Sequence, residues 1–190
     1  MGSPQSKWLD ERDYLALEVG ATQRHEYVAG IAYAMAGAGE RHNRIALNLA
    51  VQLRAAARGS SCGVYISDMK LRIDSGPVYY YPDVMLSCEP AQPDTLFKES
   101  PGLVAEVMSP TTAAIDTREK LRAYLGIASL RYYLLVDSER AAVSHYVRGE
   151  SGKWLAGTLE GGEEVAVDCG PIPAALSLPA IYEDTGLPMS

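Results

Sequence analysis

The sequence predicts an α/β fold in which a mixed central sheet is flanked by helices, with a hairpin near the N-terminus and an antiparallel meander near the C-terminus. Strand-like runs rich in β-branched and aromatic residues are bounded by Pro, Gly and Ser. These runs alternate with helical patterns, which is the order expected of helices packed on a sheet. The run at residues 103–110 is apolar on both faces apart from one carboxylate, as in a central strand covered on both sides.

Short-range patterns predict the individual elements. Two strand-like runs flank Ala29-Gly30 and indicate a hairpin. The longest helix is indicated by Ile45, Leu49 and Leu53, which recur every four residues, and by Gly59 as its C-cap. In chain order we expect a helix at 7–18, strands at 23–28 and 31–36, a helix at 40–58, one long bent strand at 63–73, a strand at 79–86, a surface connection at 89–102, a strand at 103–110, a helix from a capping box at 116–119 to 126, strands at 131–137, 142–148 and 153–158, and a tail of short turns at 171–188.

Length and composition indicate one domain at residues 1–190, of which residues 1–7 are expected to be disordered. Hydrophobic residues make up 47% and charged residues 22% of the chain, as is ordinary for a globular protein. No run approaches the roughly 18 apolar residues of a membrane span, so no membrane association is expected. The N-terminus lacks an apolar signal core, so we expect a cytoplasmic protein.

The three cysteines, Cys62, Cys88 and Cys169, lie far apart in the sequence. An odd number of cysteines without a CxxC spacing indicates neither a zinc site nor a disulfide framework. We therefore expect three reduced cysteines in the core.

The net charge of −7 argues against a protein that coats nucleic acid generally, because such a protein would be basic. A local basic face remains compatible with this charge. Four arginines share the longest expected helix: Arg41, Arg44, Arg54 and Arg58.

Two carboxylates stand within apolar strand-like runs, Asp83 in the first run and Glu106 in the second. A buried carboxylate costs several kcal/mol unless it is paired, protonated or bound to a metal. By the two-residue period of a strand, Asp83 shares a face with Met85, and Glu106 shares one with Val104 and Met108. If the two strands are neighbours in register, both carboxylates point into one cleft, where they could hold Mg²⁺ or Mn²⁺. The alternative is that each acid ends its strand at the solvent edge.

These residues resemble the PD-(D/E)XK nuclease superfamily, with Pro82-Asp83 as the PD element and Glu106 as the second acid. More closely, the chain resembles the small bacterial family of putative restriction endonucleases, in order and over nearly its whole length. The resemblance implies a restriction-endonuclease-like fold and a metal-dependent endonuclease that hydrolyses phosphodiester bonds in DNA. It also implies that Asp83, Glu106 and the carbonyl of Val107 hold the metal. The matching segments are 24–30, 41–43, 67–72, 80–85, 106–112, 116–120 and 129–137.

The chain departs from the superfamily pattern at Met108, where a lysine is expected two positions after the second acid. The resemblance implies that the basic residue has moved to the following helix, where Lys120 is the candidate. Lys120 could equally be an exposed helix partner of Asp116, and Lys70 is a second candidate for the site. As a helix-surface residue, Lys120 is expected to contribute little to stability.

Two further residues are candidates for the same cleft. By the resemblance, Glu26 in the hairpin is a further acid, although a surface pair across the hairpin would explain it as well. His42, near the start of the longest helix, could assist with a water or a phosphate, or it could simply begin the helix.

A nuclease of this kind cuts duplex DNA as a dimer, because one site handles one strand. The 12 tyrosines and the apolar C-terminal meander could supply an interface, so we expect a homodimer. The rival to an enzyme is a nuclease-derived binding protein without catalysis. The acidic charge and the missing lysine favour that rival, whereas Asp83, Glu106 and Lys120 favour the enzyme.

Overall fold

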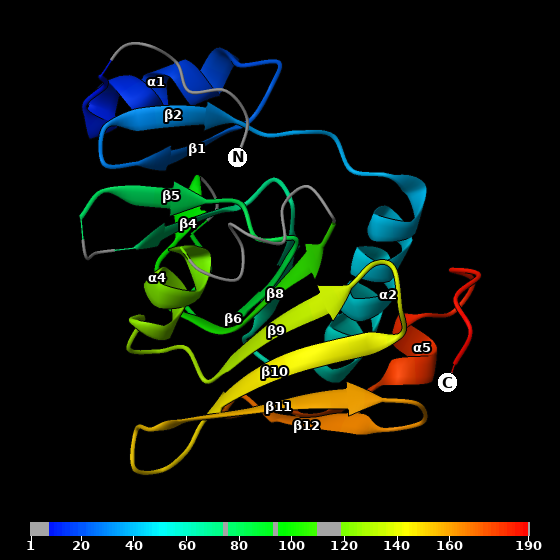
Figure 1. Ribbon diagram of the computed structural model, residues 1–190. Coiled ribbons are helices and arrows are strands. Elements are labelled where there is room, and N and C mark those ends of the chain that lie inside the picture. Colours follow the sequence, from blue (N-terminus) through cyan, green and yellow to red (C-terminus); the bar gives the residue numbers. More distant parts are fainter. Residues whose placement is uncertain (1–7, 74–75, 93–94, 110–118, 190) are drawn as a thin grey trace.

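The computed structural model describes residues 8–73, 76–92, 95–109 and 119–189, whose arrangement is shown in Figure 1. The expected disorder at 1–7 and the expected N-cap at Asp116 lie outside these residues. The helices are α1 (Glu11–Gly20), α2 (Glu40–Ala56), α4 (Leu121–Leu125) and α5 (Leu178–Ile181). The strands are β1 (His25–Val28), β2 (Ile31–Ala34), β3 (Gly63–Ile66), β4 (Lys70–Ile73), β5 (Val78–Tyr80), β6 (Val84–Ser87), β7 (Phe97–Lys98), β8 (Pro101–Met108), β9 (Tyr132–Asp137), β10 (Ala142–Arg148), β11 (Trp154–Glu160), β12 (Glu164–Asp168) and β13 (Pro173–Ser177). No described helix is long and apolar enough to cross a membrane.

Two mixed sheets carry the fold, which confirms the expected α/β class. The larger sheet has the strand order β11-β10-β9-β8-β6-β3, and only β8 and β9 pair in parallel within it. The smaller sheet has the order β2-β1-β5-β4-β7, and only β4 and β7 pair in parallel. Strands β12 and β13 form a separate antiparallel pair.

The larger sheet is covered on both faces. On one face, Leu49 of α2 packs in a core cluster with Val84 and Ala105. On the other face, Tyr124 of α4 packs with the alternate residues Met85 and Val104. Figure 1 shows α2 and α4 on either side of the central strands. Strand β8 is therefore the doubly covered central strand that its composition predicts.

The N-terminal hairpin is confirmed, with β1 and β2 joined at Ala29-Gly30. Both turn residues have positive φ, 49° at Ala29 and 91° at Gly30. A Cβ at Gly30 would lie 2.0 Å from Nε1 of Trp8. Only glycine can therefore occupy this position without displacing the indole.

Element boundaries differ from expectation at both ends of the chain. The first helix begins at Glu11 rather than residue 7, because the side chain of Asp10 caps it by accepting the N–H of Asp13 at 2.8 Å. The tail at 171–188, expected to contain only short turns, includes β13 and α5. The connection expected at 89–102 contains β7 and the first residues of β8.

Two expected strands are each divided between the sheets, so both of these predictions are wrong. The segment at 63–73 turns at Ser67-Asp68, which places β3 in the larger sheet and β4 in the smaller one. The segment at 79–86 is broken at Pro82, which has no N–H to donate to a ladder, and β5 and β6 join different sheets. Within β3 to β6 the chain thus crosses between the sheets at Ser67-Asp68 and again just before Asp83.

The expectation of three reduced cysteines is wrong for two of them. Gly63 and Ser87 pair in the β3–β6 ladder, and the adjoining Cys62 and Cys88 form a disulfide. Their 26-residue separation hides a cross-strand contact that no local spacing reveals. Cys169 is a free thiol, and burial raises its pKa to about 12.

Candidate active site

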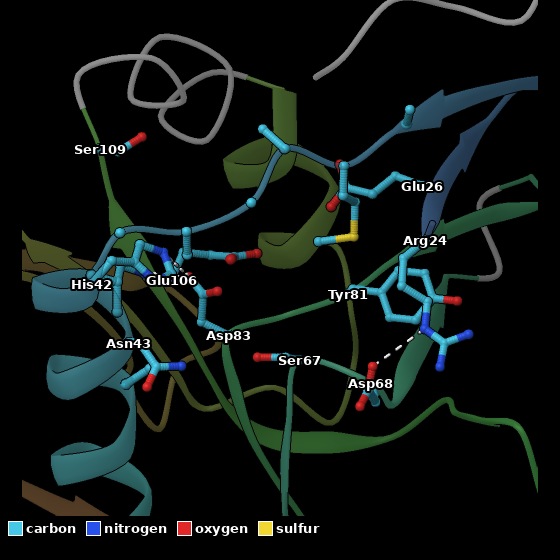
Figure 2. Close-up of a pocket in the computed structure, with 18 of the residues that line it drawn as sticks. Arg24, Glu26, His42, Asn43, Ser67, Asp68, Tyr81, Asp83, Glu106 and Ser109 are labelled. Carbon is cyan, nitrogen blue, oxygen red and sulfur yellow. Dashed lines mark hydrogen bonds and ion pairs between the residues drawn. The ribbon is translucent and has the colours of Figure 1, made fainter. Parts of the chain in front are cut away.

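A cavity of about 820 Å³ lies beside the point where the chain crosses from the smaller to the larger sheet (Figure 2). Three elements and two connecting segments supply its candidate residues. Strand β1 carries Glu26, α2 carries His42, and β8 carries Glu106. Asp83 comes just before β6, and Lys120 just before α4. All five residues predicted for the cleft, together with Val107, line this one cavity.

Asp83 and Glu106 lie on adjoining strands. Val84 pairs with Ala105 in the antiparallel β6–β8 ladder, so the next facing positions are 83 and 106. Facing residues of a ladder project to the same side of the sheet. In addition, Oδ2 of Asp83 accepts the N–H of Val107 at 2.8 Å, which ties the first carboxylate to the strand that carries the second. The two acids therefore share a cleft, and neither simply ends a strand at the solvent edge.

Lys120 is the cation at the floor of the cavity. Its Nζ lies 2.8 Å from Oε1 of Glu26 and 3.3 Å from Oε1 of Glu106. The ammonium also lies 5.4 Å from the ring centre of Tyr80. A buried ammonium is tolerated when carboxylates compensate its lost hydration. Glu26 is accordingly buried beside Lys120, and it is not part of a surface pair across the hairpin.

The expectation that Lys120 is an exposed helix residue is wrong, since its side chain is only 8% exposed. Loss of Lys120 should therefore lower the free energy of unfolding by more than loss of a surface lysine would. The other candidate, Lys70, is buried elsewhere, with its Nζ 5.4 Å from the ring centre of Tyr81. Of these two lysines, only Lys120 lines the cavity.

Tyr124 is a residue of the site that the sequence reasoning missed. Its hydroxyl donates to Oε1 of Glu106 at 2.7 Å, and its side chain is fully buried. Burial, and secondarily the charge of Glu106, raise the pKa of Tyr124 well above its usual 10. The available signal was its spacing, because residues four apart on a helix share a face and Tyr124 follows Lys120 by four.

His42 and Asp83 form a pair nearer the opening of the cavity. Nε2 of His42 lies 3.2 Å from Oδ2 of Asp83, and the two side chains are 18% and 17% exposed. The side chains of Glu26, Glu106 and Lys120 are only 4–8% exposed. The site thus has a buried floor with a cation between two carboxylates, and a more accessible histidine–aspartate pair.

The oxygen donors around this cavity match the preference of a small hard cation. Within the described parts of the chain, no group of three or more His, Cys, Asp or Glu side chains is arranged to hold a metal ion. Mg²⁺ does not require such a cage, since it is commonly held by one or two carboxylates together with waters and substrate phosphates. The donor set of Asp83, Glu106 and the Val107 carbonyl is therefore chemically suited to Mg²⁺ or Mn²⁺.

This fold, with its acids and lysine at one end of a central strand, is that of a restriction-endonuclease-like protein. Residues 12–180 match the Uma2 family, described as putative restriction endonuclease, and the chain belongs to this family.

Two similar proteins come from Synechocystis sp. (strain ATCC 27184 / PCC 6803 / Kazusa), and both are named as uncharacterized. Protein sll1609 is 35% identical over 159 residues, covering 82% of this chain and 90% of its own. Protein slr1290 is 35% identical over 148 residues, covering 77% of this chain and 78% of its own.

A similar solved structure is that of a putative nuclease belonging to DUF820 from Anabaena variabilis ATCC 29413. It superimposes with a TM-score of 0.71 at 14% identity, covering 92% of this chain and 97% of that one. At this level of identity, the likeness establishes the shared fold.

Proposed function

We propose that the protein is a metal-dependent endonuclease that hydrolyses phosphodiester bonds in DNA. The observation that carries this proposal is the burial of Lys120 between Glu26 and Glu106, in the cavity that Asp83 also lines. A structural ion pair needs no such cavity, whereas phosphoryl transfer needs carboxylates and a cation around an accessible space. Membership of the Uma2 family supports the same reading.

In this proposal Asp83, Glu106 and the carbonyl of Val107 hold Mg²⁺ or Mn²⁺. The contacts of Asp83 with His42 and Val107 both fall on Oδ2, so we assign Oδ1 to the cation. A metal ion bound there would lower the pKa of a coordinated water and offset the charge of the phosphoryl group.

The protein side chains have separate roles. The ammonium of Lys120 stabilises the negative charge that develops on the phosphoryl oxygens. Glu26 and Tyr124 position this centre, since Glu26 contacts Lys120 and Tyr124 donates to Glu106. His42 orients Asp83. In the reaction, a water oxygen bonds to phosphorus and gives up one proton, the bond to the leaving oxygen breaks, and the leaving oxygen takes up a proton.

Plasmid cleavage tests this function. The wild-type protein should nick or linearise DNA with Mg²⁺ or Mn²⁺, and EDTA should abolish the activity. Asp83→Asn and Glu106→Gln keep the size of each side chain and should each abolish cleavage. Glu164→Gln, at an exposed acid of β12, is the matched control and should cleave as the wild type does.

The rival function is a binding protein without catalysis, favoured by the net charge of −7 and by Met108 at the lysine position of the superfamily. Titration of Mn²⁺ separates the two functions. An enzyme should bind Mn²⁺ in a manner that Asp83→Asn and Glu106→Gln abolish. Wild-type protein that neither binds Mn²⁺ nor cleaves DNA would favour the binding protein.

We also propose a homodimer, for which the exposed Leu155 of the C-terminal meander is a candidate contact. Sedimentation should show about twice the 20.5 kDa chain mass at micromolar concentration. A single species of the chain mass would contradict the dimer and leave the chemistry of the site unaffected.

A further inference from the structure

The groups proposed to act on the phosphate lie deep inside the cavity. The carboxylates of Glu26 and Glu106 and the ammonium of Lys120 are at the floor, with side chains 6%, 4% and 8% exposed. The volume of about 820 Å³ lies in the range of pockets that enclose a small-molecule ligand, roughly 300–1,000 Å³. A phosphodiester that reaches Lys120 must therefore leave the molecular surface and enter the cavity.

Main chain forms two opposite walls of this cavity. One wall is the connection at 35–39, which joins β2 to α2, and the other includes the Ser67-Asp68 turn. In Figure 2 the connection runs from the hairpin to His42, with Ser67 and Asp68 on the far side of Asp83. Arg24 near the hairpin pairs with Asp68 in the turn, Nε to Oδ1 at 3.2 Å, which links the hairpin to that turn. A substrate that reaches Lys120 must fit between these two segments, and a single strand is narrower than a duplex.

Two lysine or arginine side chains are among the described residues that line the cavity, Arg24 and Lys120, and both have carboxylate partners. Duplex binding relies on lysines and arginines that neutralise many phosphates. Here Arg24 is paired with Asp68, and on α2 the guanidinium of Arg44 lies 3.0 Å from Glu40. Arg41 lies 3.4 Å from Glu139. The described lining of the cavity thus offers few cations to phosphates, which favours a substrate that makes few phosphate contacts.

The connection at 35–39 presents small and apolar residues to the cavity, among them Met35, Ala36 and Ala38. Ala46 of α2 lines the same space. Unpaired bases expose flat, weakly polar faces that pack on such a surface, whereas the bases of a duplex are stacked inside it.

We propose that the substrate of this site is single-stranded or locally unpaired DNA rather than continuous duplex. This inference rests on the proposed function, because it names the substrate that the same floor residues act on. Enzymes whose reactive groups lie in an enclosed pocket act on single strands, or first extrude the target nucleotide from the duplex. The cavity has room for about one or two nucleotides, on the scale of small-ligand pockets.

End-labelled oligonucleotides of one sequence test the proposal, in the presence of Mg²⁺ or Mn²⁺. The strand is offered alone, in a perfect duplex, and in a duplex with an unpaired internal bubble. We expect the single strand and the bubble to be cut at least about tenfold faster than the perfect duplex, the difference that 1.4 kcal/mol in the barrier would produce. Cuts in the third substrate should fall within the bubble.

Two variants sharpen the test. Ala38→Phe should fill part of the cavity and reduce cleavage of the single strand, while circular dichroism reports whether the fold is kept. The double variant Arg54→Ala/Arg58→Ala removes two exposed cations at the other end of α2 and should cleave the single strand as the wild type does. Should Ala38→Phe fail to fold, the comparison of the three substrates still decides the proposal.

The outcomes separate the two proposals. Equal or faster cleavage of the perfect duplex overturns the single-strand preference and leaves the endonuclease in place. Selective loss of duplex cleavage in the Arg54→Ala/Arg58→Ala variant would show that α2 binds a duplex, and it would also overturn the preference. No cleavage of any substrate with either metal overturns both the endonuclease and its substrate.

Discussion

Two buried carboxylate clusters in this molecule are built from similar side chains. In the first, Glu106 accepts a hydrogen bond from Tyr124 and pairs with Lys120. In the second, Glu18 at the end of α1 accepts a hydrogen bond from Tyr81 and lies 2.9 Å from Nδ1 of His25. Both clusters hold a carboxylate, a tyrosine and a basic group away from water.

The two clusters differ in access. Glu106 and Lys120 line the cavity, whereas the second cluster reaches it through Tyr81 and neither Glu18 nor His25 is among the described residues around it. Strand β1 serves both clusters, because His25 and Glu26 are consecutive and project to opposite faces. Buried ionisable groups thus do not define an active site by themselves. An open space beside them makes the first cluster a candidate for catalysis, while the second holds α1 and Tyr81 in place.

The largest difference between the clusters should appear when each loses one member of its ion pair. Lys120→Met should lower cleavage by about 10²–10³-fold, as the loss of one stabilising donor does. It should also lower the free energy of unfolding by about 3–5 kcal/mol, because two buried carboxylates lose their cation. Urea unfolding and plasmid cleavage measure the two effects. Stability equal to that of the wild type would show that Lys120 is not buried as described.

Glu18→Ala should lower the free energy of unfolding and leave cleavage unchanged. It leaves His25 and Tyr81 without their carboxylate, so unfolding should become easier by about 3 kcal/mol. Cleavage per folded molecule should stay at the wild-type level, because Glu18 does not face the cavity. Urea unfolding and cleavage at low temperature provide the comparison. Loss of cleavage by the folded protein would mean that the two clusters are coupled.

The tyrosines of both clusters should respond alike to alkaline pH. Burial raises the pKa of Tyr124 and of Tyr81 above the usual value of about 10. Above about pH 10 the unfolded chain releases its phenol protons, whereas the folded protein keeps them. The stability that each of these tyrosines contributes is therefore complete below about pH 10 and is lost as the pH rises above it. Five further tyrosines have a raised pKa: Tyr14, Tyr27, Tyr79, Tyr80 and Tyr182.

Stability should therefore fall steeply above about pH 10, by up to about 1.4 kcal/mol per pH unit for each tyrosine involved. Tyr124→Phe and Tyr81→Phe should each make the slope shallower by one such contribution. Urea unfolding at several alkaline pH values measures the slope. A slope unchanged in both variants would show that these phenols titrate normally in the folded protein.

The smallest effect is expected at Lys70, which lies near the second cluster. Burial lowers the pKa of Lys70. The buried ammonium is therefore less stable in the folded protein than in the unfolded chain. Lys70→Met should raise stability slightly at neutral pH, and this gain should shrink as the pH rises from the lowered pKa towards the normal value of about 10.4. Cleavage should remain at the wild-type level, in contrast to Lys120→Met. A large loss of cleavage in Lys70→Met would transfer the role of the site lysine to Lys70.

The sequence by itself determined most local elements and the residues proposed for the site, apart from Tyr124. Apolar repeats and turn residues predict the hairpin at Ala29-Gly30 and helix α2, because both depend on residues a few positions apart. The alternation of side chains along a strand likewise predicts that Asp83 and Glu106 face one cleft, given that their strands are neighbours. The ordered motifs predict the small bacterial family of putative restriction endonucleases, which the family match over residues 12–180 confirms.

Only the tertiary structure decided which sheet each strand joins and what surrounds each charge. The break at Pro82 sends β5 and β6 to different sheets, and the pairing of β3 with β6 brings Cys62 to Cys88. Lys120 became buried because Glu26, 94 positions earlier in the sequence, lies 2.8 Å from it. Such contacts depend on sheet order, which is set by packing between segments far apart in the chain and leaves no local periodicity in the sequence.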